Sequence, residues 1–168
     1  MATMMMFHVP EDPGLLAAFG EVALRHEHLS HILRMTIKTF AGVEVNEALD
    51  ATAFDGASLL RERVRKHAKQ RLGEGQALLK VQAFVERCRR ATEKRNEYVH
   101  SVWAQELDGE AKRRDGSHRW LPIPTVVELH ALSQELLALT QELNYARLEG
   151  FIFEALSGRR AEKGSRNH

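Results

Sequence analysis

Apolar residues in the first quarter of the chain recur at spacings of three and four, which is the pattern of one buried helical face. The pattern predicts a helix over residues 14–40, with Asp12 as its cap, Pro13 at the first position and Gly42 at its end. Its apolar face is formed by Leu15, Phe19, Val22, Leu29, Ile32, Leu33 and Ile37. Residues 41–57 contain several turn formers, so we expect this stretch to be less regular.

Two more helices are predicted in the middle of the chain. The first covers residues 58–72, is mostly polar and ends at Gly73 and Gly75. The second begins near Gln76 and carries one continuous stripe: Leu78, Val81, Val85, Cys88, Thr92, Arg95, Val99 and Val102. Arg95 therefore occupies a stripe position where apolar side chains are expected, and a charged side chain there needs a reason.

The last long helix begins at Thr125, where Glu128 three residues later completes a capping box. Its apolar positions alternate threes and fours, and a glutamate precedes them every seven residues. The apolar set is Leu129, Leu132, Leu136, Leu139, Leu143 and Ala146, and the acidic set is Glu128, Glu135, Glu142 and Glu149. The seam resembles a coiled coil, but we favour an ordinary bundle helix with a solvated acidic edge.

The remaining segments complete the expected architecture. Residues 101–124 contain two Asp-Gly turns, which indicate a small hairpin or meander. Residues 158–168 are polar, so we expect a disordered basic tail. The predicted fold is an all-α bundle of about four to five helices with a short β-hairpin insert before the last helix. Residues 1–157 form its single domain.

Composition narrows the class of protein. The 168 residues, 43% of them hydrophobic, suffice for one ordinary core. No apolar run approaches the length of a membrane span, and the start of the chain lacks the basic region of a secretory signal. Cys88 is the single cysteine, which excludes an internal disulfide and fits a reducing compartment. We therefore expect a cytoplasmic protein without a membrane partner.

Charge is segregated along the chain although the net charge is only +1. Residues 61–100 carry 12 basic and 5 acidic side chains, whereas residues 1–60 carry 3 basic and 8 acidic. A basic stripe of this kind can bind a polyanion such as RNA, or it can pair with acidic helices of the same bundle. The candidate RNA contacts are Arg61, Arg65, Lys69, Arg89, Lys94 and Tyr98. For Tyr98, and for Trp103 nearby, we favour a place in the core over base stacking.

The sequence RNEYVH, residues 95–100, lies in this basic quarter. The spacing Arg-x4-His alone carries no information, because a chain with 17 Arg and 9 His contains it about once by chance. It occurs at Arg95 and His100 and again at Arg113 and His118. The first pair is set apart by the stripe position of its arginine and by the asparagine that follows. We interpret the second pair as part of a solvated loop.

Helix geometry separates the two charged members of RNEYVH. Residues five apart lie about 140° apart around a helix, so Arg95 and His100 do not share a face. Asn96 and His100 do share one, so Asn96 is predicted to orient the histidine ring or to contact phosphate. For Arg95 to reach a substrate held by His100, either the helix kinks or a second chain supplies the complement.

Histidines elsewhere do not predict a metal site. In HEHLSH, residues 26–31, His28 and His31 share a helical face, but the segment is not an HExxH motif. We interpret these histidines as structural or surface residues and expect no metal and no cofactor. Cys88 lies on the apolar stripe without a histidine partner, so we expect an inert core thiol.

RNEYVH resembles the Arg-polar-x3-His motif of the HEPN superfamily (higher eukaryotes and prokaryotes nucleotide-binding domains). The context agrees over residues 14–155: a long helix ending in the motif, then the tryptophan of SVW, a hairpin and a capped helix. The resemblance implies a homodimeric helical bundle. In many members the motif forms a metal-independent endoribonuclease, often a toxin or defence effector controlled by a separate antitoxin or regulatory protein.

Carried over residue by residue, the resemblance makes Arg95 the motif arginine, Asn96 the polar residue and His100 the motif histidine. Such a site would cleave RNA by attack of its own 2′-OH, with His100 as acid or base and Arg95 stabilising the phosphate. Some HEPN proteins are not catalytic. The alternative is therefore a non-catalytic HEPN-like module that binds RNA, a nucleotide or a protein.

Overall fold

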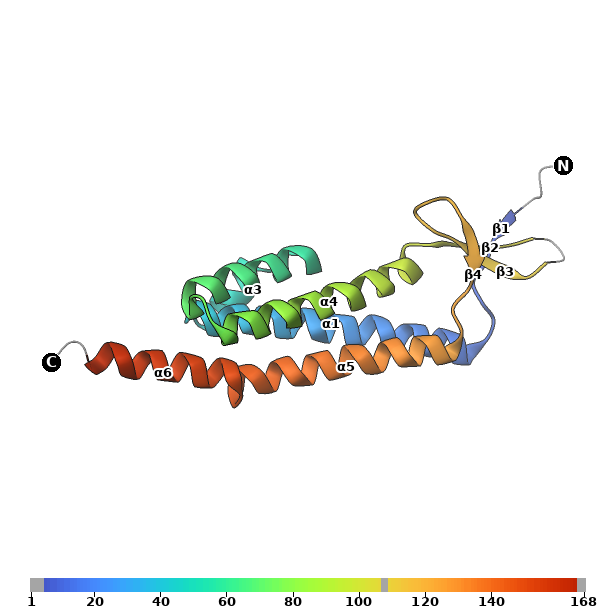
Figure 1. Cartoon of the computed structure of the whole chain (residues 1–168). Coiled ribbons are helices and arrows are strands. Elements are labelled where there is room, and N and C mark those ends of the chain that lie inside the picture. The colour runs from blue at the N-terminus through green and yellow to red at the C-terminus, as the bar shows by residue number, and fades with distance from the viewer. Residues whose placement is uncertain (1–4, 107–108, 166–168) are drawn as a thin grey trace. The chain divides into compact units, whose positions relative to one another are not determined.

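The computed structural model describes residues 5–106 and 109–165, and within these ranges it contains six helices and four strands (Figure 1). The helices are α1 (Pro13–Ala41), α2 (Val45–Ala51), α3 (Ala57–Leu72), α4 (Gln76–Val99), α5 (Val126–Leu148) and α6 (Phe151–Ser165). The strands are β1 (Met5–Phe7), β2 (Val102–Glu106), β3 (Ala111–Arg114) and β4 (Trp120–Pro122). The protein is thus mostly helical with a small antiparallel sheet, and the prediction of a helical architecture is confirmed.

The ends of the long helices follow the capping signals. The carboxylate of Asp12 accepts the backbone N–H of Gly14 at 2.8 Å, and Gly42 ends α1 with a φ of 71°. At the start of α5, the backbone N–H of Thr125 donates to the Glu128 carboxylate at 2.8 Å. The Glu128 N–H donates in return to the Thr125 hydroxyl at 3.2 Å. This reciprocal pair is the predicted capping box.

Two helical segments lie where the sequence predicts irregular structure. The short helix α2 falls inside the stretch expected to be irregular, and Thr52 behind it is buried. The side chain of Arg34 donates to the carbonyls of Thr52 and Asp55 at 3.4 and 3.5 Å, which ties this stretch to α1. Residues 158–165 form the end of α6 rather than a disordered tail, and residues 166–168 lie outside the described part.

The sheet has the order β1-β2-β3-β4, and every neighbouring pair is antiparallel. Strands β2 to β4 form a three-stranded meander where the sequence predicts a hairpin or a meander, so the insert is larger than a single hairpin. Strand β1 comes from a segment without a sequence signal. Residues paired directly across strands share a face of the sheet. Trp103, paired with Arg113, therefore lies on one face, and Val102, paired with Arg114 and through it with Trp120, lies on the other.

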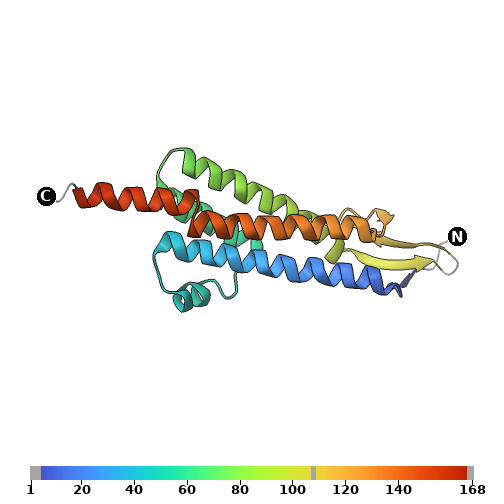
Figure 2. The ribbon, with the colours of Figure 1, turned by 90° about the horizontal axis from the view of Figure 1, so that it is seen from below.

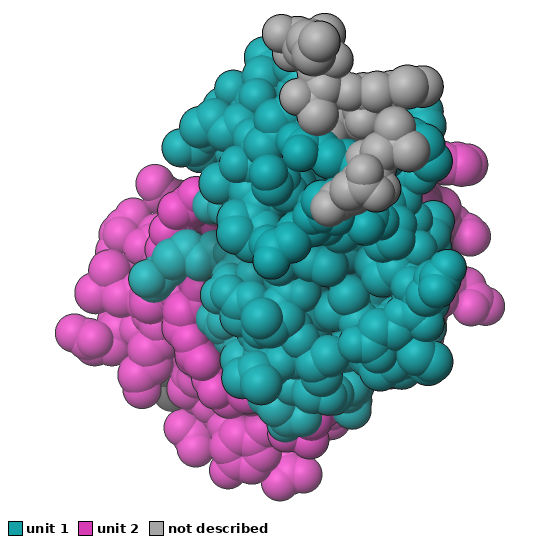
Figure 3. All heavy atoms as spheres, turned by 90° about the vertical axis from the view of Figure 1, so that its right-hand side faces the viewer, with its two compact units in different colours: residues 1–26, 90–136 teal, residues 27–89, 137–168 magenta. Residues whose placement is uncertain are grey.

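The chain divides into two compact units, coloured separately in Figure 3. Unit 1 consists of Met1–His26 and Arg90–Leu136, and unit 2 consists of Glu27–Arg89 and Leu137–His168. Helices α1, α4 and α5, seen as continuous ribbons in Figure 2, contribute residues to both units. The prediction of a single domain over residues 1–157 stays a prediction.

Helix α5 buries its apolar seam and exposes its acidic edge, as the heptad-like pattern predicts. The buried positions are Leu129, Leu132, Leu136, Leu139, Leu143 and Ala146, and the exposed ones are Glu128, Glu135, Glu142 and Glu149. Glu142 forms an ion pair of 2.6 Å with Arg87 of α4 within unit 2. Across the residues that the structure describes, no helix is both long and apolar enough to cross a bilayer.

Candidate functional site at the end of helix α4

The RNEYVH segment occupies the last turns of α4, within unit 1. Arg95 and Asn96 are half-buried, and His100 is exposed immediately after the helix ends at Val99. The backbone N–H of His100 donates to the carbonyl of Asn96 at 3.0 Å, which completes the final helical turn. Because this turn is helical, the geometric reason for placing Arg95 and His100 on different faces still applies.

The side chain of Asn96 has a different partner from the one predicted. Nη1 of Arg95 donates to Oδ1 of Asn96 at 3.0 Å, so the asparagine holds the arginine rather than the ring of His100. Nε of Arg95 is shielded from solvent and has no hydrogen-bond partner among the described residues. A buried N–H without a partner costs roughly 1–3 kcal/mol, so the position of Arg95 is not explained by its own stabilising contacts.

Arg113 corrects the interpretation of the second Arg-x4-His pair as a solvated loop. Its side chain is only 9% exposed, and it donates to the carbonyls of Pro122 at 3.2 Å and Glu97 at 3.3 Å. It also reaches the hydroxyl of Ser101 at 3.4 Å, and its guanidinium lies 5.2 Å from the centre of the Tyr98 ring. Arg113 therefore joins strand β3 to the turn that carries the motif.

Only His118 fits the solvated-loop interpretation. It is exposed in the turn after β3, and its φ of 64° is unusual for a residue other than glycine.

The burial of Arg113 has a weak signal in the sequence. Three cations, Lys112 to Arg114, follow one another in a strand, and period two places the middle one opposite its neighbours.

The two aromatic residues beside the motif belong mainly to the interior of unit 1. Tyr98 is 5% exposed, and burial raises the pKa of its hydroxyl, with the nearby Glu128 carboxylate adding to the effect. The indole N–H of Trp103 donates to the carbonyl of Tyr98 at 3.0 Å. Its ring meets Phe19 edge to face, with 5.5 Å between ring centres. Tyr98 is thus a core residue, as favoured, and its ring is not open to a base.

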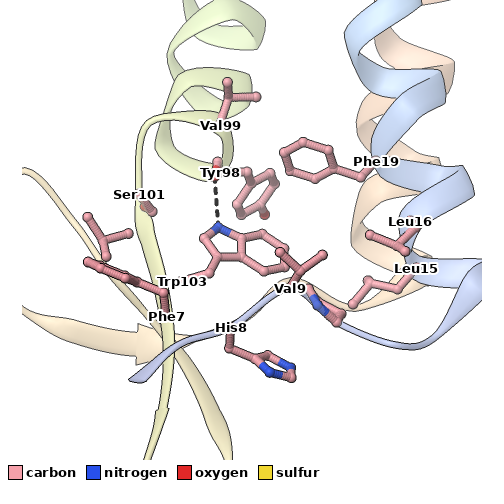
Figure 4. A pocket seen from close by; sticks show the side chains of 12 residues that line it. Phe7, His8, Val9, Leu15, Leu16, Phe19, Tyr98, Val99, Ser101 and Trp103 are labelled. Carbon is pink, nitrogen blue, oxygen red and sulfur yellow. Dashed lines mark hydrogen bonds between the residues drawn. The ribbon is translucent and has the colours of Figure 1, made fainter. Parts of the chain in front are cut away.

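An apolar pocket of about 470 Å³ lies next to this segment, within unit 1 (Figure 4). Its wall comes from three places: the segment from Phe7 to Pro10, the first turns of α1, and residues 98–99 and 101–103. His100 is not among the lining residues. Phe19 and Trp103 both line the pocket, and Figure 4 shows their side chains pointing toward one another. The volume falls in the range of small-molecule sites. Sequence reasoning missed this pocket, because strand β1 that brings in its first wall has no sequence signal.

The candidate RNA contacts are divided between the two units. Arg61 is only 7% exposed, which leaves little of it open to RNA, and its role as an RNA contact stays a prediction. Lys69 lies 3.7 Å from Glu74, and Arg89 lies 2.7 Å from Glu86, so these cations have acidic neighbours. Arg61, Arg65, Lys69 and Arg89 belong to unit 2, whereas Lys94 and Tyr98 belong to unit 1 with the motif.

The other ionisable groups of interest are Glu128 near the motif and the histidines of α1. The pKa of Glu128 is lowered, first by the backbone N–H of Thr125 and then by its hydroxyl, with Lys94 and Arg113 as weaker contributors. His28 and His31 are exposed, as expected for surface histidines. Within the described ranges, no group of three or more His, Cys, Asp or Glu side chains is arranged to hold a metal ion.

No protein-family model, curated protein or solved structure matches this chain. The structure accordingly defines a mostly helical protein with a small four-stranded antiparallel sheet. Its resemblance to the HEPN superfamily remains a prediction from the motif RNEYVH and its sequence context.

Proposed function

We propose that the protein is a HEPN-like, metal-independent endoribonuclease that acts as a toxin or defence effector. The proposed site consists of Arg95, Asn96 and His100, completed by the same residues of a second copy of the chain. The protein would be cytoplasmic, and a separate antitoxin or regulatory protein would control it.

The observation that carries the proposal is that Arg95 and Arg113 have different hydrogen-bond partners. One alternative explanation of RNEYVH is that Arg95 is a structural staple that binds carbonyls at a helix end. Arg113 is the residue that makes such bonds, to the carbonyls of Glu97 and Pro122. Arg95 instead donates to the side chain of Asn96, one turn from the exposed His100. A role toward an anionic substrate explains this arrangement better than a role in stability.

The proposed reaction uses groups that the motif supplies. His100 of one copy accepts the proton of the 2′-OH, and O2′ then forms a bond to the adjacent phosphorus. The bond from phosphorus to O5′ breaks, and His100 of the second copy protonates the leaving oxygen. The products are a 2′,3′-cyclic phosphate and a 5′-OH end. Arg95 neutralises charge on the phosphorane, and Asn96 holds the guanidinium in place.

The second copy is needed for a geometric reason. The helical geometry of the last turn predicts that Arg95 and His100 face different ways, so a single chain would offer a phosphate only one of them. Two-fold symmetry would place the arginine of one copy beside the histidine of the other.

The test compares two exposed histidines. Purified wild type, His100→Ala and His118→Asn are incubated with RNA in the presence of a chelator, and cyclic phosphate ends are quantified. His118→Asn is the matched control because asparagine tolerates the positive φ of 64° at this position. We expect His100→Ala to lose roughly 10²-fold or more in rate and the control to keep the wild-type rate. Equal activity of all three proteins would refute the proposal.

The alternative is a non-catalytic HEPN-like module that binds RNA, a nucleotide or a protein partner. The pocket of about 470 Å³ beside the motif favours it, because a pocket of this size suits a small ligand and none of Arg95, Asn96 and His100 lines it. Salt-sensitive RNA binding without any product would support this alternative.

A further inference from the structure

We infer that the outer face of the sheet is a binding platform for single-stranded RNA. The outer face is defined by Phe7, Val102, Lys112, Arg114, Trp120 and Pro122. The choice of RNA as the ligand rests on the proposed function, whereas the binding itself needs neither Arg95 nor His100.

The strand register places these side chains on one surface. Val102 pairs with Arg114, which pairs with Trp120, and Lys112 pairs with Pro122. In the same row, Phe7 pairs with Ala104, the partner of Lys112. Directly paired residues share a face, and the opposite face holds Trp103 and Arg113. Figure 4 shows Phe7 and Trp103 on opposite sides of β2.

Large apolar side chains of the outer face are open to solvent. Phe7 is 90% exposed, Val102 is 46% exposed and Trp120 is 40% exposed. Single exposed apolar residues are common on protein surfaces, but a group that includes two aromatic rings on one face of a sheet marks an interaction site.

Positive charge accompanies the aromatic rings. The guanidinium of Arg114 lies 5.9 Å from the centre of the Trp120 ring, and Lys112 stands in the adjacent row. Lys112 and Arg114 are the basic side chains of this face, and Glu106, which shares it by register, lies 4.0 Å from Lys112. Arg113 is buried on the opposite face, and Arg119 beyond β3 is paired with Asp115 at 2.9 Å. The face therefore has a small excess of positive charge, which favours an anionic strand.

Aromatic rings interspersed with cations favour RNA over a protein partner. Every base has a π face that stacks on an aromatic ring, and backbone phosphates attract Lys and Arg whatever the sequence. Lysine is depleted at the centre of protein interfaces. The rings of Phe7 and Trp120 belong to the two outermost strands, about three strand spacings or roughly 14 Å apart, so they serve different bases of one strand. Bases of an A-form duplex are stacked on one another and do not reach such a platform.

The test is direct binding of a short fluorescein-labelled oligouridine, followed by anisotropy in the His100→Ala background so that cleavage does not interfere. The platform variant is Phe7→Ala with Trp120→Ala, and its matched control is Phe54→Ala, a fully exposed phenylalanine of unit 2. Loss of each stacked ring is expected to weaken binding at least roughly fivefold, and loss of both roughly 30-fold. Circular dichroism confirms that each variant is folded.

A second pair of variants tests the charge. Arg114→Gln should weaken oligouridine binding and reduce its salt dependence, whereas Arg25→Gln on α1, away from the sheet, should change neither. The platform assignment is overturned by platform variants that bind like their controls, or by a duplex that binds as tightly as the single strand. It is also overturned if the platform variant changes self-association while RNA binding stays intact, since the face would then bind protein.

The experiment separates this inference from the proposed function. Platform-dependent binding without cleavage dependent on His100 would leave the platform standing and remove the nuclease. If cleavage depends on His100 but neither cleavage nor binding responds to the platform variants, the nuclease stands and the platform is removed.

Discussion

The guanidinium of Arg95 is hydrogen-bonded to the side-chain carbonyl of its immediate neighbour, Asn96, at 3.0 Å. Adjacent residues on a helix do not normally face each other, so this bond bends both side chains toward the same point on the helix surface. The motif thus contains a preformed arginine–amide pair beside a separate, exposed histidine. The pair gives Asn96 a defined role, which is to restrict the positions that the guanidinium can adopt.

Asn96→Ala should reduce RNA cleavage under the proposed function, because the released Arg95 would sample several rotamers in place of one. We expect kcat to fall roughly tenfold to 100-fold, with little change in KM if phosphate stabilisation is the part that is lost. Asn96→Asp keeps an acceptor oxygen and should retain more activity than the alanine variant. Steady-state kinetics on one RNA substrate would decide, and an alanine variant as active as wild type would contradict this role.

Arg113→Ala should destabilise unit 1 by about 2–4 kcal/mol, because it removes the side-chain donor to the Pro122 carbonyl and one of the donors to the Glu97 carbonyl, which also accepts from the Ser101 hydroxyl. Arg114→Ala, its exposed neighbour in β3, should change stability by no more than about 0.5 kcal/mol. Urea unfolding followed by tryptophan fluorescence would measure both, since the chain's 2 tryptophans belong to unit 1. Equal effects of the two substitutions would show that Arg113 is not a staple.

The capping box of α5 should make stability depend on pH at the acidic end. The pKa of Glu128 is lowered below its ordinary 4.5, mainly by the Thr125 N–H, so its contribution is complete above that value. It is lost as the pH falls through the lowered, folded-state pKa. Because the site is exposed, Glu128→Gln should cost only about 0.5–1 kcal/mol at pH 7. The cost should be smaller at pH 3, which lies below the ordinary pKa of 4.5. Unfolding free energies at the two pH values test this, and an equal cost at both would disprove the charge effect.

The thiol of Cys88 should be inert in the folded protein. Burial raises its pKa to about 12 from 9.0, which by itself lowers the thiolate fraction near pH 8 roughly 1000-fold. A coloured disulfide reagent should therefore react with the native protein at least that much more slowly than with the urea-unfolded chain. The double variant Cys88→Ala with Ala53→Cys moves the thiol to an exposed position and should react quickly without urea. Rapid reaction of the native wild type would indicate local opening of unit 2.

Much of the helical framework follows from local signals. Asp12, Gly42, Thr125 and Glu128 mark helix ends that the structure places within a residue or two, because capping depends on neighbours in sequence. The apolar stripe predicted for α4 agrees less well with the buried positions near the end of the helix. An α-helix with 3.6 residues per turn drifts against a spacing of threes and fours. Tyr98 is therefore the buried residue of the last turn, while Arg95 and Val99 are half-buried.

Features that depend on distant partners could not be predicted in the same way. Arg113 is one of three consecutive cations, and the carbonyls that bury it come from β4 and from the end of α4. Strand β1 has three residues, and its pairing with β2 is its only sign of being a strand. The prediction that Arg95 and His100 face different ways stays a prediction. The hydrogen bond of Asn96 to Arg95 in place of the His100 ring could not be foreseen, because the rotamer of a neighbouring arginine is invisible in the sequence.

The pairing of strand β1 also constrains the order in which parts of the chain can fold during synthesis. Met5–Phe7 leaves the ribosome well before its pairing partner Val102–Glu106, which is synthesised only after the four helices between them. During that interval the exposed apolar side chain of Phe7 has no sheet to join. The helices can form as they emerge, because their contacts are local, whereas the sheet must wait for a long-range closure. A nascent-chain experiment should therefore find the sheet, and with it the proposed RNA platform, among the last parts of the molecule to become protected.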